Sequence, residues 1–487
     1  MNEHKVENIE IEGSESFRDS LGIVEKSGKR KWIYPKKPKG RFTNARNVFS
    51  GILLLILFGT PFIKIGNHPF MLFDIINRKF ILFGFPFGPH DFYLLGLTMI
   101  TSIVFIFLFT AVFGRLFCGW VCPQTVFMES VFRKIDYWIE GDYRNQQRLN
   151  ESHWTGEKTF KKGIKYIIYF SISFLTANML LAWIIGIDAL EAIVVTPINE
   201  HLSGFIAITL FTGLFYFIFI WFREQACILV CPYGRLQGVL LDQNSIVIAY
   251  DYLRGEPRGK IKRNEERKLG DCISCNECVV VCPTGIDIRN GTQLECVNCT
   301  ACIDACDNVM DKIKKPRGLI RYVSQNGIKE KVRKIFTTRV IGYTVVQVLL
   351  LSLLTYFLTT RSEIDVTILR TPGMFYQEQP HDKVSNLYDM KVLNKTFEQR
   401  NIEVKLLNRE GEIKILGDNK SINPQEAALT KMFISLDKES ITAMNTPLEI
   451  GVYSGGVEIQ KINTSFLGPV EKKKRHDDKH SDEKEEH

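Results

Sequence analysis

Cysteine and histidine are absent from long parts of this 487-residue chain, and their absence narrows the possible chemistry. No cysteine lies before Cys118 or after Cys306, so all twelve fall within one stretch. None of the nine histidines lies in the middle of a long apolar run. Because a haem held between membrane helices normally needs such histidine ligands, we predict no haem of that kind. No glycine-rich phosphate loop stands between a strand and a helix, so that signature of nucleotide binding is also missing.

Lysine and arginine are absent from residues 187–202, although the whole chain carries a net charge of +8. The basic residues flank long apolar runs, as they do in membrane proteins, so we exclude nucleic acid as the partner. Five runs are long enough to span a bilayer as helices, which makes membrane lipid a partner. The predicted spans are 48–66, 92–113, 164–187, 203–222 and 340–359.

The distribution of basic residues predicts how these helices are oriented. Lysine and arginine are dense in 29–46, 115–165 and 312–339, which puts the N-terminus in the cytoplasm and the C-terminus outside. The segment 1–28 is polar, so we expect no cleavable signal peptide and a bacterial inner membrane location. The apolar stretch 80–87 is too short to span and contains Pro86, which favours an interfacial segment. Every cysteine then faces the cytoplasm or the inner membrane edge, where disulfides are rare, so metal or redox chemistry is expected.

The C-terminal third contains short alternating segments typical of strands. Residues 402–407 and 412–416 flank a polar turn, and Gly455–Gly456 marks a hairpin. Several short strands within about a hundred residues predict a β-sandwich. The expected parts are 1–46 (basic N-terminal segment), 47–222 (four-helix membrane part with a cytoplasmic loop at 115–163), 223–335 (cytoplasmic segment), 340–359 (fifth helix), 362–468 (external β domain) and 469–487 (charged, disordered tail).

Eight cysteines form two runs with ferredoxin spacing, DCISCNECVVVCPTG and LECVNCTACIDACD. In bacterial two-cluster ferredoxins the fourth cysteine of each run binds the other cluster, so we predict two [4Fe–4S] clusters in a module at about 262–312. Structural zinc uses two separated pairs and fits this spacing poorly. Asp307 stands where the second run would usually have proline. The assigned ligands are Cys272, Cys275, Cys278 and Cys306 for one cluster and Cys296, Cys299, Cys302 and Cys282 for the other.

The remaining four cysteines form a Cys-x3-Cys-Pro motif that occurs twice, in GRLFCGWVCPQ (114–124) and in ACILVCPY (226–233). Each copy follows the second helix of a predicted pair, so two pseudo-symmetric hairpins would bring the thiol pairs together at the inner membrane face. Proline disfavours a helical residue before it, so each second cysteine should end or kink a helix. The motif cysteines are Cys118, Cys122, Cys227 and Cys231.

Three interpretations of these thiols stay open. Nearby Arg115, Arg223 and Arg235 are expected to lower the thiol pKa and favour the thiolate. Thiolates are soft ligands that suit Cu(I) or an iron–sulfur cluster, so a copper or redox dithiol site and a third, shared cluster are both compatible. Free cysteine is also commonly buried for purely structural reasons.

Three stretches carry a family resemblance. They are GRLFCGWVCPQTVFMESVF, ACILVCPYGRLQ and CVVVCPTGIDIRNGTQLECVNCTACIDACDNVMDKIKKPRGLIRY. From about residue 30 to 468 the chain resembles the cytochrome cbb3 oxidase accessory protein family, also called FixG, RdxA or CcoG. The resemblance implies a membrane α-helical fold with five spans, a bacterial two-cluster ferredoxin module in the cytoplasm and a periplasmic, C-terminal Ig-like β-sandwich.

The resemblance also implies a function in oxidase assembly. Family members are regarded as copper reductases that convert Cu(II) to Cu(I) for delivery to the oxidase. This would make the motif cysteines the catalytic and copper-binding residues, with cbb3 oxidase subunits or copper-handling assembly factors as partners. The electron donor would be a cytoplasmic protein or a quinol. Two alternatives are a quinol dehydrogenase-like protein that feeds another acceptor and a redox-sensing assembly scaffold.

Overall fold

The computed structural model describes residues 29–75, 78–197, 199, 201–260, 269–380, 382–417, 421–441 and 443–469. Of the disordered tail predicted at 469–487, all but residue 469 lies outside the described residues, as does the segment 1–28. The chain divides into two compact units, which are described separately here. The membrane unit comprises Met1–Asn77, Ile81–Gly84 and Tyr93–Tyr356, and the β unit comprises Arg78–Phe80, Phe85–Phe92 and Phe357–His487.

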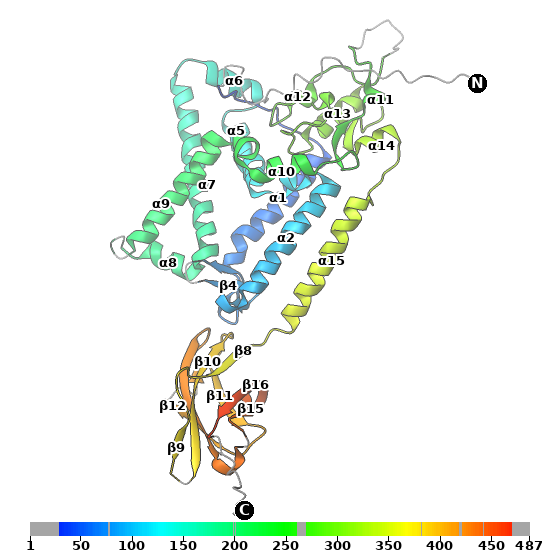
Figure 1. Ribbon diagram of the computed structural model, residues 1–487. Coiled ribbons are helices and arrows are strands. Elements are labelled where there is room, and N and C mark those ends of the chain that lie inside the picture. Colours follow the sequence, from blue (N-terminus) through cyan, green and yellow to red (C-terminus); the bar gives the residue numbers. More distant parts are fainter. Residues whose placement is uncertain are drawn as a thin grey trace, which may run out of the picture. The chain divides into compact units, whose positions relative to one another are not determined.

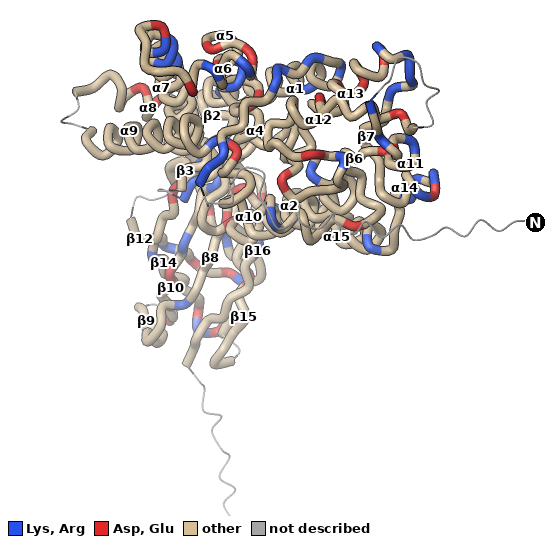
Figure 2. The backbone as a smooth tube through the Cα atoms, turned by 90° about the horizontal axis from the view of Figure 1, so that it is seen from above, with Lys and Arg blue, Asp and Glu red and all other residues tan. Residues whose placement is uncertain are grey.

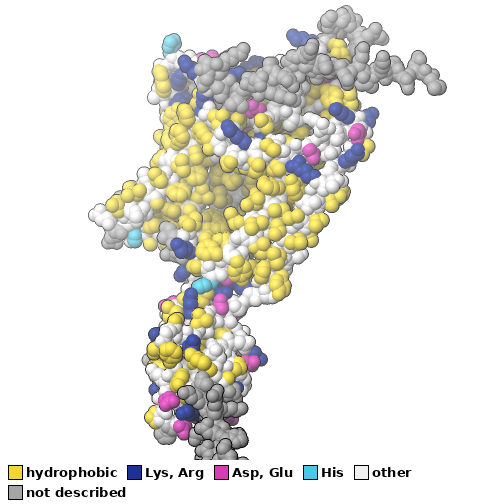
Figure 3. Space-filling model, viewed as in Figure 1, with side chains coloured by type: hydrophobic (Ala, Val, Ile, Leu, Met, Phe, Trp, Pro, Cys, Tyr) yellow, Lys and Arg dark blue, Asp and Glu magenta, His cyan; other side chains and the backbone are white. Residues whose placement is uncertain are grey.

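Five helical segments in the described residues are long and apolar enough to cross a membrane, which confirms the predicted number. Apolar side chains cover the visible face of these helices (Figure 3), as a lipid-facing surface requires. The candidate spans are Arg41–Phe62, Pro89–Phe113, Gly156–Ile185, Leu202–Phe222 and Thr338–Thr359. Their helices are α1 (Arg41–Gly59), η1 (Thr60–Phe62), η2 (Pro89–Asp91), α2 (Phe92–Phe113), α7 (Gly156–Ile185), α9 (Leu202–Phe217), η4 (Ile218–Phe222) and α15 (Thr338–Thr359).

Two helices begin well before their predicted spans. Helix α7 starts at Gly156 because the side chain of Thr155 accepts a hydrogen bond from Lys158 N, a local N-terminal cap. Helix α1 starts at Arg41 although Gly40 offers no side-chain cap. Its cap comes from a distant residue, since Asp304 accepts hydrogen bonds from the backbone of Phe42 and Thr43. Apolar patterning locates the membrane-spanning length but does not predict these polar first turns.

The rest of the membrane unit consists of short elements that connect the spans and build the cysteine-rich module. Residues 80–87, predicted to be interfacial, lie in strands β4 and β5 and the turn between them. The short helices are α3 (Leu116–Trp120), α4 (Pro123–Thr125), η3 (Val126–Phe132), α5 (Arg133–Ile139), α6 (Tyr143–Glu151), α8 (Ile187–Val195), η5 (Ala226–Val230), α10 (Pro232–Leu240), α11 (Tyr252–Gly255), α12 (Glu277–Val280), η6 (Ile288–Asn290), α13 (Ala301–Lys312) and α14 (Gln325–Lys329). The strands of the membrane unit are β1 (Lys64–Ile65), β2 (His68–Pro69), β3 (Leu72–Asp74), β6 (Val247–Tyr250) and β7 (Ile320–Val323). The boundary between the two units passes through β4 (Lys79–Leu82), and β5 (Phe85–Phe87) belongs to the β unit.

The cysteine-rich module is closed by an antiparallel pair of strands far apart in the sequence. Strand β6 pairs with β7, with Val247 opposite Val323, so the chain between them forms one folded loop. Figure 1 shows α11 to α14 gathered at one end of α1 and α2. The apolar core of the module includes Ile248, Ile303 and Leu319, all nearly inaccessible to solvent. This core holds the cysteine loops against the end of the membrane helices.

The β unit contains two antiparallel sheets, which confirms the predicted Ig-like sandwich. One sheet has the order β12-β14-β10-β8, with β9 beside β10, and the other has the order β13-β11-β15-β16. Strands β11 and β12 follow each other in the chain yet lie in different sheets, while Gly455–Gly456 joins the paired β15 and β16 as predicted. The strands are β8 (Ile364–Arg370), β9 (Gln377–Gln379), β10 (Lys383–Asn394), β11 (Arg400–Leu406), β12 (Glu412–Leu416), β13 (Ser421–Ile422), β14 (Ala427–Asp437), β15 (Asn445–Ser454) and β16 (Val457–Leu467), with η7 (Lys438–Ser440) between β14 and β15.

Candidate metal centre

Two cavities in the module are lined by the ferredoxin-type cysteines. The first cluster cavity measures about 350 Å³, and its cysteines are Cys272, Cys275, Cys278 and Cys306. The second cluster cavity measures about 340 Å³, and its cysteines are Cys278, Cys282, Cys296, Cys299 and Cys302. Cys278 borders both cavities. Cys306, the fourth cysteine of the second run, lies with the first three cysteines of the first run, and Cys282 lies with the first three of the second run. This is the grouping that crossed cluster ligation requires.

The loops that carry these cysteines have the same backbone shape twice. Ser274 and Asn276 have positive φ angles of 53° and 59°, and Asn298 and Thr300, at the matching positions of the second run, have 54° and 67°. Non-glycine residues rarely adopt this conformation, and such residues gather at functional sites. The left-handed residues curl each loop around its cavity. The thiol donors and the apolar walls therefore fit two iron–sulfur clusters.

The two cluster cavities differ in their contact with solvent and charge. Cys275, in the first, is exposed, whereas Cys299, in the second, is buried. The buried Arg46 of α1 donates a hydrogen bond to the carbonyl oxygen of Cys299 at 2.8 Å. Burial raises the pKa of Cys296 to about 12 and that of Cys299 to about 11. These thiols are protonated without metal, and iron would displace their protons on binding.

The two Cys-x3-Cys-Pro motifs fold alike, as their repeat predicted. A left-handed residue precedes each motif, Gly114 with φ 57° in the first copy and Arg223 with φ 46° in the second. The amides of Cys122 and Cys231 donate to the carbonyl oxygens of Phe117 and Ala226, both at 2.9 Å. The prolines that follow these cysteines begin α4 and α10. The predicted break at each second cysteine is therefore present in both copies.

The four motif thiols lie close enough to influence one another, but the expected activation by arginine is wrong. Burial raises the pKa of Cys118 to about 12, with smaller contributions from Cys122 and Cys231. Burial likewise raises the pKa of Cys227 to about 12, with further upward contributions from the other three thiols. The charge of Arg115 lowers the pKa of Cys118, but the effect of burial is larger. Among the described residues, no three His, Cys, Asp or Glu side chains converge closely enough to hold a single ion.

The arginines near the motifs are engaged elsewhere. Arg115 donates hydrogen bonds to the carbonyl oxygens of Leu294 and Gly234, so it joins the module to the second motif. Arg223 pairs with Asp136 at 2.8 Å. Arg235 is on α10 and is only partly buried. None of the three is therefore dedicated to stabilising a thiolate.

Each first cysteine lies near a residue from the other copy. Cys118 Sγ donates a hydrogen bond to Gln237 Oε1 at 3.1 Å. Cys227 and Met128 line one cavity of about 330 Å³, which we call the thiol-side cavity. When the two motifs are aligned on their cysteines, Met128 and Gln237 occupy equivalent positions. The two hairpins are thus arranged reciprocally, and the four thiols belong to one site, here called the four-thiol site.

The four-thiol site adjoins the second cluster cavity. Thr284 and Val297 line both this cavity and the thiol-side cavity. On the first motif, a Cβ added to Gly119 would stand 2.5 Å from the carbonyl oxygen of Asn298, so only glycine permits this approach. Helix α3 therefore packs directly against the loop that carries Cys299.

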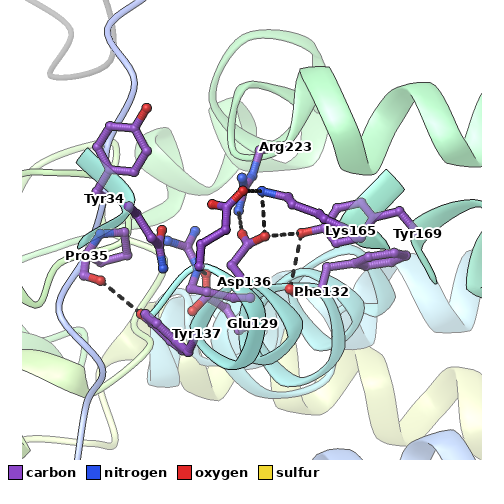
Figure 4. Close-up of polar contacts among 12 residues, drawn as sticks. Tyr34, Pro35, Glu129, Phe132, Asp136, Tyr137, Lys165, Tyr169 and Arg223 are labelled. Atoms are coloured by element: carbon purple, nitrogen blue, oxygen red, sulfur yellow. Dashed lines mark hydrogen bonds and ion pairs between the residues drawn. The ribbon is translucent and has the colours of Figure 1, made fainter. Parts of the chain in front are cut away.

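A buried chain of ion pairs lies beside the second motif (Figure 4). Burial alone would raise the pKa of Asp136, but Arg223 and Lys165 hold that pKa well below its usual range. This network was not predicted from the sequence. The sequence feature that indicates it is a series of charged residues at helical spacing directly after the first motif, namely Glu129, Arg133, Asp136 and Glu140. The pairs are Arg46–Glu129 at 3.7 Å, Arg133–Glu129 at 2.9 Å, Arg133–Glu224, Arg223–Asp136 at 2.8 Å, Lys165–Asp136 at 2.7 Å, Lys165–Glu140 at 3.3 Å and Lys162–Glu140 at 2.8 Å.

Three family models match separate parts of the chain. A 4Fe-4S dicluster domain matches residues 222–325, which include Cys227, Cys231 and the eight ferredoxin-type cysteines. A 4Fe-4S binding domain matches residues 95–144, where Cys118 and Cys122 are the only cysteines. The model described as an IG-like fold at the C-terminal of FixG, putative oxidoreductase, matches residues 354–469.

Curated relatives match most of the chain. Protein RdxB of Cereibacter sphaeroides is 36% identical over 396 residues, which are 77% of this chain and 82% of RdxB. Protein RdxA of the same organism is 34% identical, over 76% of this chain and 80% of RdxA. Nitrogen fixation protein FixG of Rhizobium meliloti is 30% identical over 468 residues, 84% of this chain and 87% of FixG. Together with the cysteine geometry, these matches show that the chain belongs to the FixG/RdxA family and is an iron–sulfur electron-transfer protein.

Proposed function

We propose that this protein reduces Cu(II) to Cu(I) at the four-thiol site and that the product supplies copper for assembly of a cbb3-type oxidase. The observation that carries the proposal is the pair of shared residues, Thr284 and Val297, which line both the second cluster cavity and the thiol-side cavity. A thiol site adjoining a cluster site suits a metal ion that must take up one electron. The role in oxidase assembly rests on the family resemblance.

The eight ferredoxin-type cysteines are proposed to hold two [4Fe–4S] clusters in the crossed grouping described above. When bound, these clusters supply one-electron redox carriers. The chain's contribution is to fix their positions, since α12 and α13 are held by the module core and Asp304 of α13 caps α1. The cluster module and the first membrane helix are therefore joined as one rigid part.

The four-thiol site would retain the reduced ion better than the oxidised one. Cu(I) is soft and suits the thiols of Cys118 and Cys227, whereas Cu(II) prefers nitrogen and oxygen ligands. Because burial keeps these thiols protonated, copper binding must release protons to the surroundings. Met128, in the thiol-side cavity, adds a soft thioether to one side of the site. One copper ion gains one electron in the proposed step.

The same proposal includes a topology and partners. The Lys/Arg distribution favours a bacterial inner membrane, with the N-terminus and the cluster module in the cytoplasm and the β unit in the periplasm. The partners would be oxidase subunits or copper-handling assembly factors. The electrons would come from a cytoplasmic protein or from quinol.

A second candidate has one observation in its favour. The 4Fe-4S binding model matches 95–144, where Cys118 and Cys122 are the only cysteines available. The four thiols could therefore hold a third cluster, and the protein would pass electrons to an acceptor other than copper. Its iron content distinguishes this candidate from a copper reductase.

The test uses the full chain, purified anaerobically, beside a variant with Cys118, Cys122, Cys227 and Cys231 all replaced by serine. Clusters are reduced chemically, excess reductant is removed and Cu(II) is added. A Cu(I) chelator and EPR then follow copper and cluster oxidation. We expect copper reduction coupled to cluster oxidation in the wild type and its loss in the variant. Both proteins should contain about eight iron atoms per chain, as two [4Fe–4S] clusters require.

Two outcomes would reject the copper proposal. One is cluster oxidation that does not track copper in the wild type. The other is a wild type with about twelve iron atoms that falls to about eight in the variant, which would identify a third [4Fe–4S] cluster. A variant that reduces copper as fast as the wild type would reject the role of the four thiols alone.

A further inference from the structure

Only one of the twelve cysteines, all of which the structure describes, is exposed. This is Cys275 of the first cluster cavity, whereas the cysteines around the second cavity are buried or half-buried. The second cavity adjoins the four-thiol site through Thr284 and Val297. The two cluster cavities therefore have different neighbours, solvent for the first and the thiol site for the second. A path that ends at the four-thiol site through the second cavity therefore has the first cavity as its solvent-exposed end.

A basic loop borders the exposed cavity. Residues 312–317 begin at the last residue of α13 and continue as a loop, and Lys312, Lys314, Lys315 and Arg317 are all exposed. The residues just before this loop and just after it line the first cluster cavity, namely Val309, Met310, Leu319 and Ile320. The loop is therefore fixed at the rim of that cavity from both ends. We call this loop, with Arg254 and Arg289, the basic rim.

Contacts around the cysteine loop hold the basic rim in place. Lys315 and Arg254 both pair with Asp271, at 3.2 and 2.6 Å, and Asp271 directly precedes Cys272. Arg254 Nη1 also donates to the carbonyl oxygen of Arg317 at 3.1 Å. On the other side, Arg289 donates to Asn276 Oδ1 at 2.8 Å, next to Cys275. These contacts place the cations beside the loop that carries Cys272 and the exposed Cys275.

The rim has the composition of a transient docking surface. Its six cations outnumber the three carboxylates that pair with them, Asp271, Asp287 and Asp311, so its net charge is positive. Leu253, beside Arg254 on α11, is 58% exposed and adds an apolar contact. Figure 2 shows lysine and arginine segments around α11, β7 and α14 in the same module. A positive field of this kind speeds the approach of a negatively charged partner.

We propose that an acidic one-electron carrier protein docks on the basic rim and gives its electron to the protein there. In this step one electron leaves the carrier and the iron–sulfur cofactor held in the first cluster cavity gains it, with no bond made or broken. The proposal specifies the donor side of the function proposed above, but it does not depend on the acceptor being copper. Anionic lipid would also bind cations, yet it gives no reason for them to lie beside the loop and the cavity of the exposed cluster cysteine.

The test measures electron entry without copper. Full-length protein with oxidised clusters is mixed anaerobically with a reduced bacterial flavodoxin, which is acidic, and flavodoxin oxidation is followed by stopped flow. The patch variant carries Lys312→Glu, Lys314→Glu and Lys315→Glu. The matched control carries Lys329→Glu, Lys331→Glu and Arg333→Glu, which are exposed in the same module and change the charge equally. Methyl viologen, a small cationic reductant, reports whether each variant still holds reducible clusters.

We expect the patch variant to lose at least about tenfold in its rate with flavodoxin, while the control loses much less. Methyl viologen should reduce all three proteins fully. The wild-type rate with flavodoxin should fall steeply between about 50 and about 300 mM salt, as screening predicts. The salt series needs no variant, so it tests the proposal even if the patch variant folds poorly.

Three results would overturn the proposal. They are equal flavodoxin rates in the patch and control variants, a wild-type rate that is insensitive to salt, and a patch variant that loses only its binding to phosphatidylglycerol vesicles. The last result would make the rim a lipid site. Rapid, salt-dependent reduction by flavodoxin followed by no transfer to Cu(II) would leave the docking surface standing and reject only the copper function.

Discussion

The two Cys-x3-Cys-Pro motifs share a backbone but not the groups that support it. Both have a residue with positive φ before the motif and a proline that starts the next helix. In both, the amide of the second cysteine donates a hydrogen bond to the carbonyl oxygen five residues earlier. Around the first copy, Arg115 satisfies two backbone carbonyls. Around the second, Arg223 enters a buried chain of charges through Asp136. The backbone is thus repeated, whereas the electrostatic environment differs between the copies.

The comparison is sharpest at the left-handed position. Glycine adopts a positive φ without penalty at Gly114, whereas Arg223 has φ 46° and ψ −122°. Such a sparsely populated conformation costs a non-glycine residue about 1–3 kcal/mol. Arg223 is retained in that conformation by ion pairs with Asp136 and Glu224. Strain of this kind persists only where the surroundings over-determine it, and it gathers at functional sites. The second copy therefore depends on its charges, while the first depends on close backbone packing.

The largest effect is expected from removing the central carboxylate of the second copy. Asp136→Asn leaves Arg223 and Lys165 buried with one partner fewer, which should cost about 3–5 kcal/mol in free energy of unfolding. Denaturant or thermal unfolding in detergent measures this. Glu157→Gln, at an exposed pair with Lys161, is the control and should leave stability unchanged. Equal stability of the two variants would show that the charge chain does not support the motif.

The same carboxylate predicts how stability depends on pH. The folded-state pKa of Asp136 lies well below its usual range, despite burial, because of Arg223 and Lys165. The stability it contributes is therefore complete above the unfolded pKa of about 3.9 and is lost as the pH falls toward the folded value. Unfolding measured from pH 6 down to the acid limit should show a steeper loss in the wild type than in Asp136→Asn. Parallel curves would contradict this assignment.

The first copy should be broken by adding one methyl group at its left-handed residue. In Gly114→Ala the new Cβ would stand 2.9 Å from both Ile246 O and Val247 Cγ1. This clash adds to the left-handed penalty, so we expect a loss of about 2–3 kcal/mol in free energy of unfolding. Gly213→Ala, where an added Cβ meets nothing within 4 Å, is the matched control on α9. A loss no greater than that of the control would show that the close packing is not required.

In the second copy, glycine at residue 223 should give a more stable protein than alanine at the same residue. Arg223→Gly and Arg223→Ala both remove the charge, but only glycine also relieves the backbone penalty. The glycine variant should therefore be more stable than the alanine variant by about 1–3 kcal/mol. Unfolding of the two variants under identical conditions gives this difference directly. If alanine were as stable as glycine, the left-handed turn at residue 223 would carry no strain.

Much of this architecture could be predicted from the sequence. There are physical reasons why the remaining parts could not. The spans, the cysteine runs and the paired strands depend on local spacing, so apolar length, Cys-x2-Cys patterns and Gly455–Gly456 were sufficient. The capping of α1 by Asp304 and the Asp136–Arg223 pair join residues far apart in the chain, which no local pattern reveals. Proximity to arginine wrongly predicted thiolates, because the depth of burial is set by the whole fold.

The smallest effect is expected at Gln237, the residue of the second copy that lies beside Cys118 of the first. Cys118 meets Gln237, whereas Cys227 shares a cavity with Met128, the counterpart of Gln237 in the first copy. Gln237→Met makes the two environments alike and removes the hydrogen bonds of Gln237 with Cys118 and Tyr233, so the loss in stability should be about 1 kcal/mol. Met128→Gln also makes the two thiol environments alike, with a glutamine near each first cysteine. It buries an amide near Cys227 without a hydrogen-bond partner, which should lower the free energy of unfolding by about 1–3 kcal/mol. Unfolding of both variants tests the asymmetry. If the two substitutions cost the same, the reciprocal contacts differ in chemistry but not in energy, and the environment of each thiol is set by the backbone alone.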